Sequence, residues 1–396
     1  MTRSYAYYKE IFAEVPMPFA FIDMDLFNEN IRQILQRTGD KKIRVASQAI
    51  RCTHILKYIL NSNPLFEGVM CYTAQEAVYL SQQGFNNLLI GYPTLQKQDL
   101  EAICEELKKG KEIILTIDSP GHLHRLNKIA ASFELKVPVC VEIDMSTDFS
   151  RTHFGAWRST IRTVEDMLSL LAEARPLTHI QIVALMGYEA QLAEIADTYQ
   201  GQMLKARSIR NMKKRSIPMI HQRRQAIASY LEETNIDLKF VNGGGTGSLE
   251  STIKDHSVTE LTIGSAFFSP ALFDNFDHFK HLPATAFAVQ IVRRPKKGVY
   301  ACLGGGYIAS GPTSMDKSPV IYLPKGAILT PEEGAGEIQT PIIYHGEERL
   351  ALGDPVFMRH SKSGELCEHF NELYLVSEGK VVDKVQTYRG EGKCFL

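Results

Sequence analysis

Eight short apolar segments alternate with longer amphipathic segments through the first two-thirds of the chain, and this alternation restricts the possible folds most strongly. The amphipathic stretches, such as 96–110, place apolar side chains three or four residues apart and end at a glycine. A strand–helix order repeated eight times predicts an α/β fold whose parallel strands close into a (β/α)8 TIM barrel. The eight predicted strands cover residues 43–47, 68–72, 87–92, 112–118, 137–144, 180–187, 237–243 and 260–264.

An open, doubly wound parallel sheet is the alternative to the closed barrel. Sheets of that kind commonly carry a GxGxxG turn after the first strand, where the glycines approach a dinucleotide closely. No such turn follows the predicted first strand, residues 43–47. The sequence therefore favours the barrel.

The sequence pattern changes after about residue 284. Proline, glycine and threonine become more frequent, and short alternating runs between tight turns are typical of antiparallel strands. We therefore assign residues 25–284 to the barrel and residues 285–396 to a second, C-terminal antiparallel β domain. Residues 1–24 form an N-terminal segment whose apolar run, 18–24, is expected to pair with that β domain.

Charge and composition exclude several classes of protein. Lys and Arg total 44 against 45 Asp and Glu, whereas a dedicated nucleic-acid-binding protein usually has a clear basic excess. The basic stretch 205–225 is interpreted as a solvated outer helix of the barrel, with a phosphate-rich partner as the alternative. No apolar run approaches the roughly 18 residues of a membrane span, and no signal peptide is recognised at residues 1–20. Seven scattered cysteines without a CxxC pair indicate reduced thiols in a cytoplasmic protein.

Active sites of such barrels form at the C-terminal ends of the strands and in the loops that follow them. This rule selects candidate positions by their place in the chain alone. They are Ser47–Arg51, Tyr72–Thr73, Tyr92, Asp118, Glu142–Arg151, Gly187–Glu189, Asn242–Ser248 and Gly264–Ser265.

The loop NGGGTGS, residues 242–248, carries the most specific chemistry among these positions. Its glycines allow a tight turn and a close approach of the backbone to an anion, while Thr246 and Ser248 add hydroxyl donors. Because the loop follows the predicted seventh strand, it lies where barrels commonly hold a phosphate group. It contains no lysine, so it is not a P-loop for a nucleoside triphosphate. A plain glycine-rich turn is the alternative.

Two further segments concentrate polar residues. Residues 142–155 bring Asp144, Arg151 and His153 to one end of the barrel, where the guanidinium of Arg151 is suited to a carboxylate or a cofactor hydroxyl, and a loop ion pair is the alternative. Residues 359–372 contain His360 and Cys367, side chains that ligate zinc. Their spacing fits no standard metal-binding signature, and the nearby Lys362 would repel a cation.

The order of several motifs resembles the fold-type III enzymes that use pyridoxal 5′-phosphate (PLP), a group that includes alanine racemases. The similarity is greatest to the branch of D-serine dehydratases and D-threonine aldolases, which are amino-acid deaminases and aldolases, and it extends over nearly the whole chain. The motifs are PFAFIDMDLFNENI, IRVASQAIRC, TAQEAVYLSQQGFNNLLIGYPT, VEIDMSTDFSR, LMGYE, NGGGTGS, ELTIGS, GEIQTP, GDPVFMRHSKSGELCEHFNELYLV and TYRGEGK.

The resemblance implies a PLP-binding barrel and a homodimer in which the β domain reaches the active site of the partner subunit. It implies a small amino-acid ligand, expected to be of D configuration, on whose α-carbon the protein acts. The charge balance and the lack of a long apolar run predict neither nucleic acid nor membrane as partner. It also implies that His360 occupies a metal-binding position. In those relatives a Cys or Asp follows two residues later, whereas this chain has Lys362 there. The implied cofactor-binding residues are Arg151, Tyr188, Asn242, Gly244, Gly245, Thr246, Gly247, Gly264 and Ser265.

The largest departure from the family lies at the end of the first barrel strand. The family motif RxxxK ends in the lysine that forms an imine with the PLP aldehyde, but the chain runs from Arg44 to Gln48. A carboxamide nitrogen is not a useful nucleophile, so Gln48 supplies neither the imine nor a proton-shuttling base. Three explanations stay open. Gln48 is an engineered substitution, or the chain is a natural non-catalytic relative, or another amine such as that of Lys362 takes the role.

Two functions are therefore predicted as alternatives. One is a PLP-dependent lyase or racemase that acts on a small D-amino acid and is impaired by Gln48. The other is a pseudoenzyme that binds PLP or an amino acid without catalysis, since the phosphate loop does not depend on the lysine. A barrel that binds a different phosphorylated ligand is a third possibility.

Overall fold

The computed structural model describes residues 3–150, 152–199, 201–311, 314–362 and 364–396. The chain divides into two compact units, each described here by itself. The barrel unit comprises residues 36–48, 56–264 and 395–396, and the sheet unit comprises residues 1–35, 49–55 and 265–394. The domain boundaries predicted after residues 24 and 284 rest on the sequence pattern alone and stay predictions.

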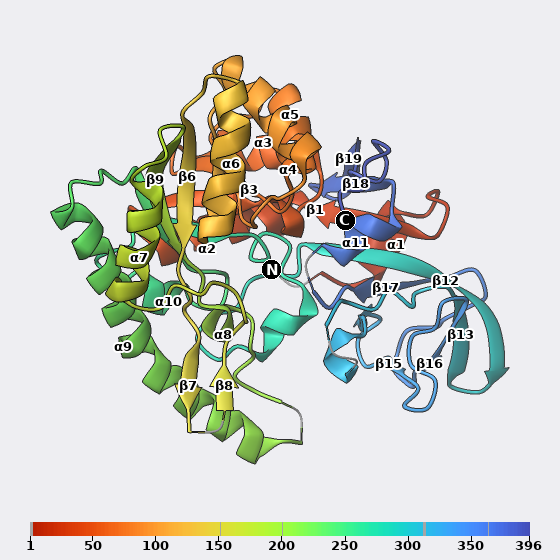
Figure 1. Ribbon diagram of the computed structural model, residues 1–396. Coiled ribbons are helices and arrows are strands. Elements are labelled where there is room, and N and C mark those ends of the chain that lie inside the picture. The colour runs from red at the N-terminus through yellow and green to blue at the C-terminus, as the bar shows by residue number, and fades with distance from the viewer. Residues whose placement is uncertain (1–2, 151, 200, 312–313, 363) are drawn as a thin grey trace. The chain divides into compact units, whose positions relative to one another are not determined.

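Eight parallel strands close into a barrel in the order β10-β11-β2-β3-β4-β5-β6-β9 (Figure 1). Each of the eight predicted strands is present, so the (β/α)8 fold is confirmed. Their register continues around the ring, for example from Thr262 to Arg44 between β11 and β2. The barrel strands are β2 (Lys42–Ala46), β3 (Phe66–Cys71), β4 (Leu88–Ile90), β5 (Ile113–Ile117), β6 (Val137–Glu142), β9 (Ile180–Gly187), β10 (Phe240–Gly243) and β11 (Glu260–Ile263).

Helices between these strands surround the barrel, as α3 to α6 do in Figure 1. Short polar side chains start several of them, because a hydroxyl oxygen accepts a free backbone N–H of the first turn. Thr73 and Ser119 cap two helices in this way, and Thr163 forms a reciprocal capping box with Asp166. The helical elements are α2 (Met24–Thr38), η1 (Ser47–Ala49), α3 (Thr53–Ser62), α4 (Ala74–Gln82), α5 (Lys97–Lys108), α6 (Pro120–Ser132), α7 (Val164–Ala174), α8 (Ala190–Ala193), α9 (Met203–Glu233) and α10 (Leu249–Thr252).

The barrel interior is filled by side chains of alternate strand residues, as expected for a packed barrel core. Its apolar part includes Met70, Leu89, Ile114, Cys140, Ala184, Met186 and Phe240. Toward the start of the strands the buried Arg44 guanidinium donates to both carboxylate oxygens of Glu260, at 2.7 and 2.8 Å. It also donates to the backbone and side-chain oxygens of Asn87, so its charge is paired and its donors are used.

The sheet unit is built on a nine-stranded sheet whose main path runs β15-β16-β13-β12-β1-β18-β19. Most pairs are antiparallel, while β1 is antiparallel to β12 and parallel to β18, and β17 pairs with both β12 and β14. The strands are β1 (Phe19–Asp23), β12 (Thr285–Lys296), β13 (Val299–Leu303), β14 (Val320–Leu323), β15 (Ile328–Leu329), β16 (Gln339–Ile343), β17 (Pro355–Arg359), β18 (Glu372–Ser377) and β19 (Lys380–Gln386). Its helical elements are α1 (Tyr5–Ile11), η2 (Ala271–Asn275), η3 (Met315–Lys317) and α11 (Glu365–His369).

Aromatic side chains join α1 to this sheet. The rings of Tyr8 and Phe12 each lie 4.8 Å from that of Phe21 on β1, and Tyr8 lies 5.6 Å from Phe357 on β17. Contacts at these separations add to the free energy gained by burial. The buried Tyr8 hydroxyl donates to Asp23 at 2.8 Å, so its polar end is also satisfied. Strand β1 is therefore held in the sheet unit by backbone pairing and by packing.

The seven cysteines are all free thiols. Six are buried and Cys394 is exposed. Burial raises the pKa of Cys52 to about 12, so this thiol stays protonated and unreactive at neutral pH. Within the part of the chain that the structure describes, no helix combines the length and the apolar character needed to cross a bilayer.

Candidate functional site

The glycine loop, residues 244–247, follows β10 at the C-terminal end of the barrel. Gly244 has φ of +85°, a left-handed conformation that residues with a Cβ rarely adopt. A Cβ on Gly245 would lie 2.7 Å from the Cβ of Ala193 and 3.3 Å from Cε2 of Tyr188. Glycine is therefore required at both positions, at one for the turn and at the other for close packing.

Some backbone amides of the glycine loop are already used inside the protein. The Gly244 N–H donates to Glu189 at 3.2 Å, and the Gly245 N–H donates to the Ser248 hydroxyl at 3.1 Å. Gly247 is buried, and its N–H has no acceptor among the described residues. A buried donor without an acceptor is costly, so this amide favours an oxygen from a ligand. The loop therefore fits an anion such as a phosphate group, at its Gly247 end.

A buried ion cluster supports the glycine loop from behind. Arg224 of α9 is fully buried and donates to Glu189 at 2.9 Å, to Asp255 at 2.5 Å and to the Gly187 carbonyl at 2.9 Å. Glu189 in turn accepts the Gly244 amide and the hydroxyl of Thr252. One side chain of the outer helix therefore links the end of β9 to the loop after β10.

Arg158 reaches the same end of the barrel from the loop after β8 (Thr152–Phe154), which forms a hairpin with β7 (Thr147–Phe149). Its Nε donates to Glu142 at the end of β6, and its Nη2 donates to the Gly91 carbonyl at 3.1 Å. Its Cζ lies 4.5 Å from the Tyr92 ring centroid. Burial raises the pKa of Glu142. Burial also acts to lower the pKa of Arg158, but the negative charge of Glu142 outweighs this effect, so the Arg158 pKa is raised.

Tyr188 lies between Arg158 and the glycine loop. Its ring centroid is 5.8 Å from the Arg158 Cζ, and its Cε2 atom lies 3.3 Å from where a Cβ on Gly245 would be. Its hydroxyl donates to Glu194 at 2.6 Å, and burial raises its pKa well above the usual value. The phenol is therefore neutral and held in one orientation. It contributes a flat apolar surface between a cation and an anion-binding loop.

In the segment 142–155 the structure shows the partners of Asp144 and His153, while the predicted binding role of the segment stays a prediction. Arg151 lies outside the described residues, so its role stays a prediction. Asp144 accepts the backbone N–H of Ser146 at 2.5 Å, and the His153 Nδ1 pairs with Asp148 at 2.9 Å. The His153 ring stacks on Trp157, with centroids 3.6 Å apart. Asp144 and His153 therefore have structural partners of their own.

Other predicted cofactor residues lie near the ends of their strands. The Asn242 amide is buried and donates to Glu260 at 2.7 Å and to Thr262 at 2.8 Å, so it joins β10 to β11. The Thr246 carbonyl accepts a 2.8 Å hydrogen bond from Arg37. Gly264 is buried directly after β11, while Ser265 is assigned to the sheet unit. The structure does not test whether these residues bind a cofactor.

Gln48 stands at the end of β2, within η1, and is exposed. It follows β2 directly, at the C-terminal end of the barrel strands where active sites of this fold form. The preceding Ser47 hydroxyl donates to the Met70 carbonyl at 2.8 Å and ties this turn to β3. The carboxamide of Gln48 lacks a nucleophilic nitrogen, and the role of this position stays a prediction.

The predicted metal ligands lie in the sheet unit. His360 is buried, both its ring nitrogens lack partners among the described residues, and burial lowers its pKa to about 3. The Cys367 thiol donates to the Ile50 carbonyl at 3.3 Å, and burial raises its pKa well above the usual value. Within the described ranges no group of three or more His, Cys, Asp or Glu is placed to hold a metal ion. One neutral imidazole and one protonated thiol do not fit a metal centre.

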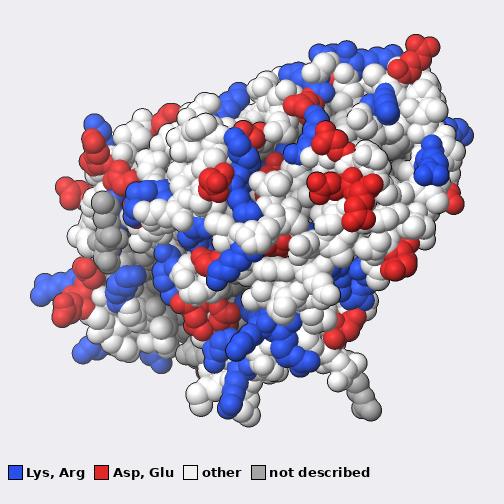
Figure 2. Space-filling model, turned by 90° about the vertical axis from the view of Figure 1, so that its left-hand side faces the viewer, with Lys and Arg blue, Asp and Glu red and all other residues white. Residues whose placement is uncertain are grey.

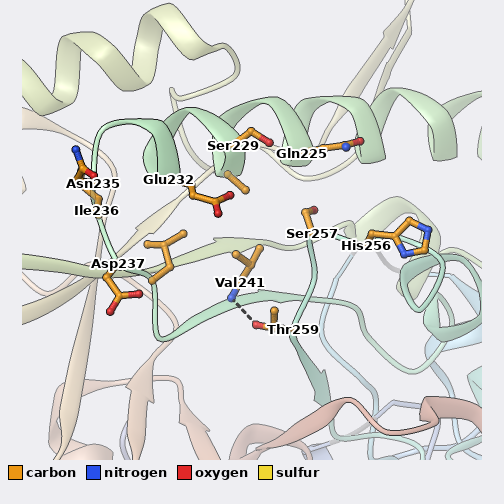
Figure 3. A pocket seen from close by; sticks show the side chains of 12 residues that line it. Gln225, Ser229, Glu232, Asn235, Ile236, Asp237, Val241, His256, Ser257 and Thr259 are labelled. Carbon is orange, nitrogen blue, oxygen red and sulfur yellow. Dashed lines mark hydrogen bonds between the residues drawn. The ribbon is translucent and has the colours of Figure 1, made fainter.

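A pocket of about 690 Å³ lies at the other end of the barrel strands (Figure 3). Its walls come from the end of α9 and from the segments that enter β10 and β11, where the Val241 N–H donates to Thr259 at 2.9 Å. In parallel barrels this N-terminal face supports stability, whereas function lies at the opposite face. The pocket is therefore separate from the candidate site.

The basic stretch 205–225 forms part of α9. Figure 2 shows basic and acidic side chains mixed over one face of the molecule, with basic ones gathered at its lower edge. Several basic residues of α9 are exposed, in agreement with an outer helix, but Lys213 and Arg224 are buried and pair with Asp197 and with the cluster beneath the glycine loop. The absence of a nucleic-acid partner stays a prediction.

Comparison with known proteins places this geometry in a family. Residues 22–268 match the family described as alanine racemase, N-terminal domain. The chain is 22% identical to 3-hydroxy-D-aspartate aldolase of Paracoccus denitrificans (strain Pd 1222) over 260 residues, which are 65% of this chain and 62% of that protein. It is 24% identical to D-threonine aldolase of an Arthrobacter species over 261 residues, with the same two shares. The alignments thus span less than two-thirds of either relative.

A solved structure extends the likeness to both units. The crystal structure of D-threonine aldolase from Filomicrobium marinum superposes with a TM-score of 0.79 and covers 96% of each chain. At 18% sequence identity this similarity establishes the fold alone.

Proposed function

Since the chain belongs to the alanine racemase N-terminal domain family of fold-type III PLP proteins, we propose that its barrel binds PLP without a covalent bond and presents it to a small amino acid. The bound cofactor would act as an electron sink for bonds at the α-carbon of an amino acid. The glycine loop would hold the cofactor phosphate, and Tyr188 would contact its flat ring. The same proposal includes a homodimer and a ligand of D configuration.

The observation that carries this proposal is a glycine loop whose Gly247 amide has no acceptor among the described residues, in a chain with Gln48 at the lysine position. The buried Gly247 amide and the close packing at Gly245 support a phosphate site. Noncovalent phosphate binding does not need a lysine at position 48, because the loop acts through its backbone. Binding is therefore expected to survive the loss of the nucleophile.

We expect purified protein to bind PLP saturably, with an absorbance spectrum that shifts on binding, and to release it on dialysis. Borohydride treatment before dialysis should leave no adduct in a peptide mass map. Gly245→Ala should weaken PLP binding at least about fivefold, because an extra methyl in a packed site costs about 1–3 kcal/mol. Gly121→Ala is the matched control, since a Cβ there meets only its own turn.

Failure of the wild-type protein to bind PLP would refute the proposal, and equal binding by the Gly245→Ala variant would remove the glycine loop from it. A borohydride adduct on Lys362 would instead favour a relocated amine. Lys362 belongs to the sheet unit, where its backbone N–H donates to Glu365 at 2.6 Å.

A PLP-dependent lyase acting on D-3-hydroxy amino acids is the second candidate. The names of the two curated relatives, both aldolases, favour it. It requires an amine that Gln48 does not offer. It would also require the metal site that the resemblance implies at His360, but Lys362 stands where the relatives have a second ligand, a Cys or an Asp. The binding function needs neither.

A further inference from the structure

Arg158 has hydrogen-bonding capacity that the protein does not use. Its Nε and Nη2 have acceptors in Glu142 and the Gly91 carbonyl, whereas its Nη1 has no acceptor among the described residues. The side chain retains 14% of its exposure, so the guanidinium is largely desolvated but still reachable from the barrel mouth. A partly desolvated guanidinium with unused N–H groups binds anions more strongly than one in water.

The surroundings of Arg158 limit the size and shape of an anion there. The centroid of the exposed Tyr92 ring lies 4.5 Å from the Arg158 Cζ, and the centroid of the Tyr188 ring lies 5.8 Å from the same atom. The glycine loop, where the backbone is suited to a phosphate, lies on the other side of Tyr188. The two anion-binding features are therefore separate, and each contacts the same tyrosine.

We propose that Arg158 binds the carboxylate of the amino-acid ligand and makes the barrel selective for α-amino acids over amines and amino alcohols. This inference rests on the proposed function, since it adds a second anchor beside the PLP phosphate loop. A guanidinium offers planar, paired donors that match a carboxylate. Glu142 opposes the interaction, because it already neutralises part of the Arg158 charge.

Trp157 provides a local signal for testing the proposal. It is the single tryptophan of the chain, it directly precedes Arg158, and its side chain is 80% exposed. In the presence of saturating PLP, titration with D-alanine should change Trp157 fluorescence at concentrations at least about tenfold lower than titration with D-alaninol, which lacks the carboxylate. Calorimetry of the same pair gives an independent measure of affinity.

The substitution Arg158→Gln should reduce this preference for D-alanine about tenfold or more, while PLP affinity stays within about threefold of wild type. Arg162→Gln is the matched control, because Arg162 lies in the same loop and pairs with Asp148 at 2.9 Å. The opposite effect is expected from Glu142→Gln, which removes the negative charge that neutralises Arg158 while its amide oxygen can still accept the Arg158 Nε, and which should strengthen D-alanine binding. The double variant Arg158→Gln/Glu142→Gln removes both charges and serves if the single variant does not fold.

Several outcomes would overturn the inference. One is an unchanged D-alanine preference in Arg158→Gln or in the double variant, and another is equal affinity of the wild type for both ligands. A loss of PLP binding in Arg158→Gln would assign Arg158 to the cofactor instead. If the wild type binds no PLP but still shows an Arg158-dependent preference in titrations without it, the proposed function fails and the carboxylate site stands.

Discussion

Gln48→Lys is expected to convert noncovalent PLP binding into a covalent attachment. Gln48 is exposed at the end of β2, so the longer side chain fits without repacking the core. A lysine amine there is the nucleophile that the family motif provides, and once released it can also move protons. We expect a borohydride-stable adduct on residue 48 of the variant, mapped by mass spectrometry, and none on the wild type.

The same variant is expected to gain turnover of D-threonine, D-serine or alanine. A positioned general base contributes about 10²–10⁴-fold to a rate, so activity should rise by at least that factor over the wild type. Gln48→Arg is the control, because it adds a positive charge that is neither nucleophilic nor able to give up its proton. Turnover by the wild-type chain equal to that of Gln48→Lys would show that another group does the chemistry.

The barrel could be predicted from the sequence because its signals are local. Strand and helix periodicities are read within a dozen residues, and the eight segments from 43–47 to 260–264 all became strands. The glycine loop was predicted for a similar reason, since three consecutive glycines are a strong backbone signal. Motif order then indicated the family, which the match over residues 22–268 confirmed.

The supporting side chains could not be predicted in the same way. Arg158 and Arg224 act through contacts with residues far along the chain, such as Gly91 and Gly187. Neither arginine stands at the end of a strand, so the positional rule did not select them. Arg224 lay within a stretch interpreted as a solvated helix, because charge alone does not distinguish the inner from the outer face. The β7–β8 hairpin was also missed, since each of its strands has only three residues.

The basic stretch did contain one usable signal for Arg224. The apolar positions Ile220, Ile227 and Leu231 of α9 are buried, and Arg224 falls four residues after the first and three before the second. Residues at these separations share one face of a helix. A charged residue on the buried face needs a buried partner of opposite charge, so the helical period alone would have raised the question of what Arg224 contacts.

Removal of the Arg224 charge is expected to be the most destabilising single change in the barrel. Arg224→Met leaves Glu189 and Asp255 buried beside each other without their shared cation. Breaking a buried ion pair in this way costs about 3–5 kcal/mol, and urea unfolding followed by circular dichroism measures that loss. Glu189 also accepts the Gly244 amide, so PLP affinity should fall as well, because the loop loses its support.

Two comparison variants separate the charge effect from the loss of side-chain volume. Arg207→Met changes an exposed arginine on the same helix and should alter the unfolding free energy by no more than about 0.5 kcal/mol. The triple variant Arg224→Met/Glu189→Gln/Asp255→Asn removes both unpaired charges and should recover much of the lost stability. A single Arg224→Met variant as stable as Arg207→Met would mean that the cluster does not hold the loop. The triple variant could regain stability without regaining PLP binding. That result would show that the glycine loop needs the Glu189 carboxylate itself, which accepts the Gly244 amide, to keep its geometry.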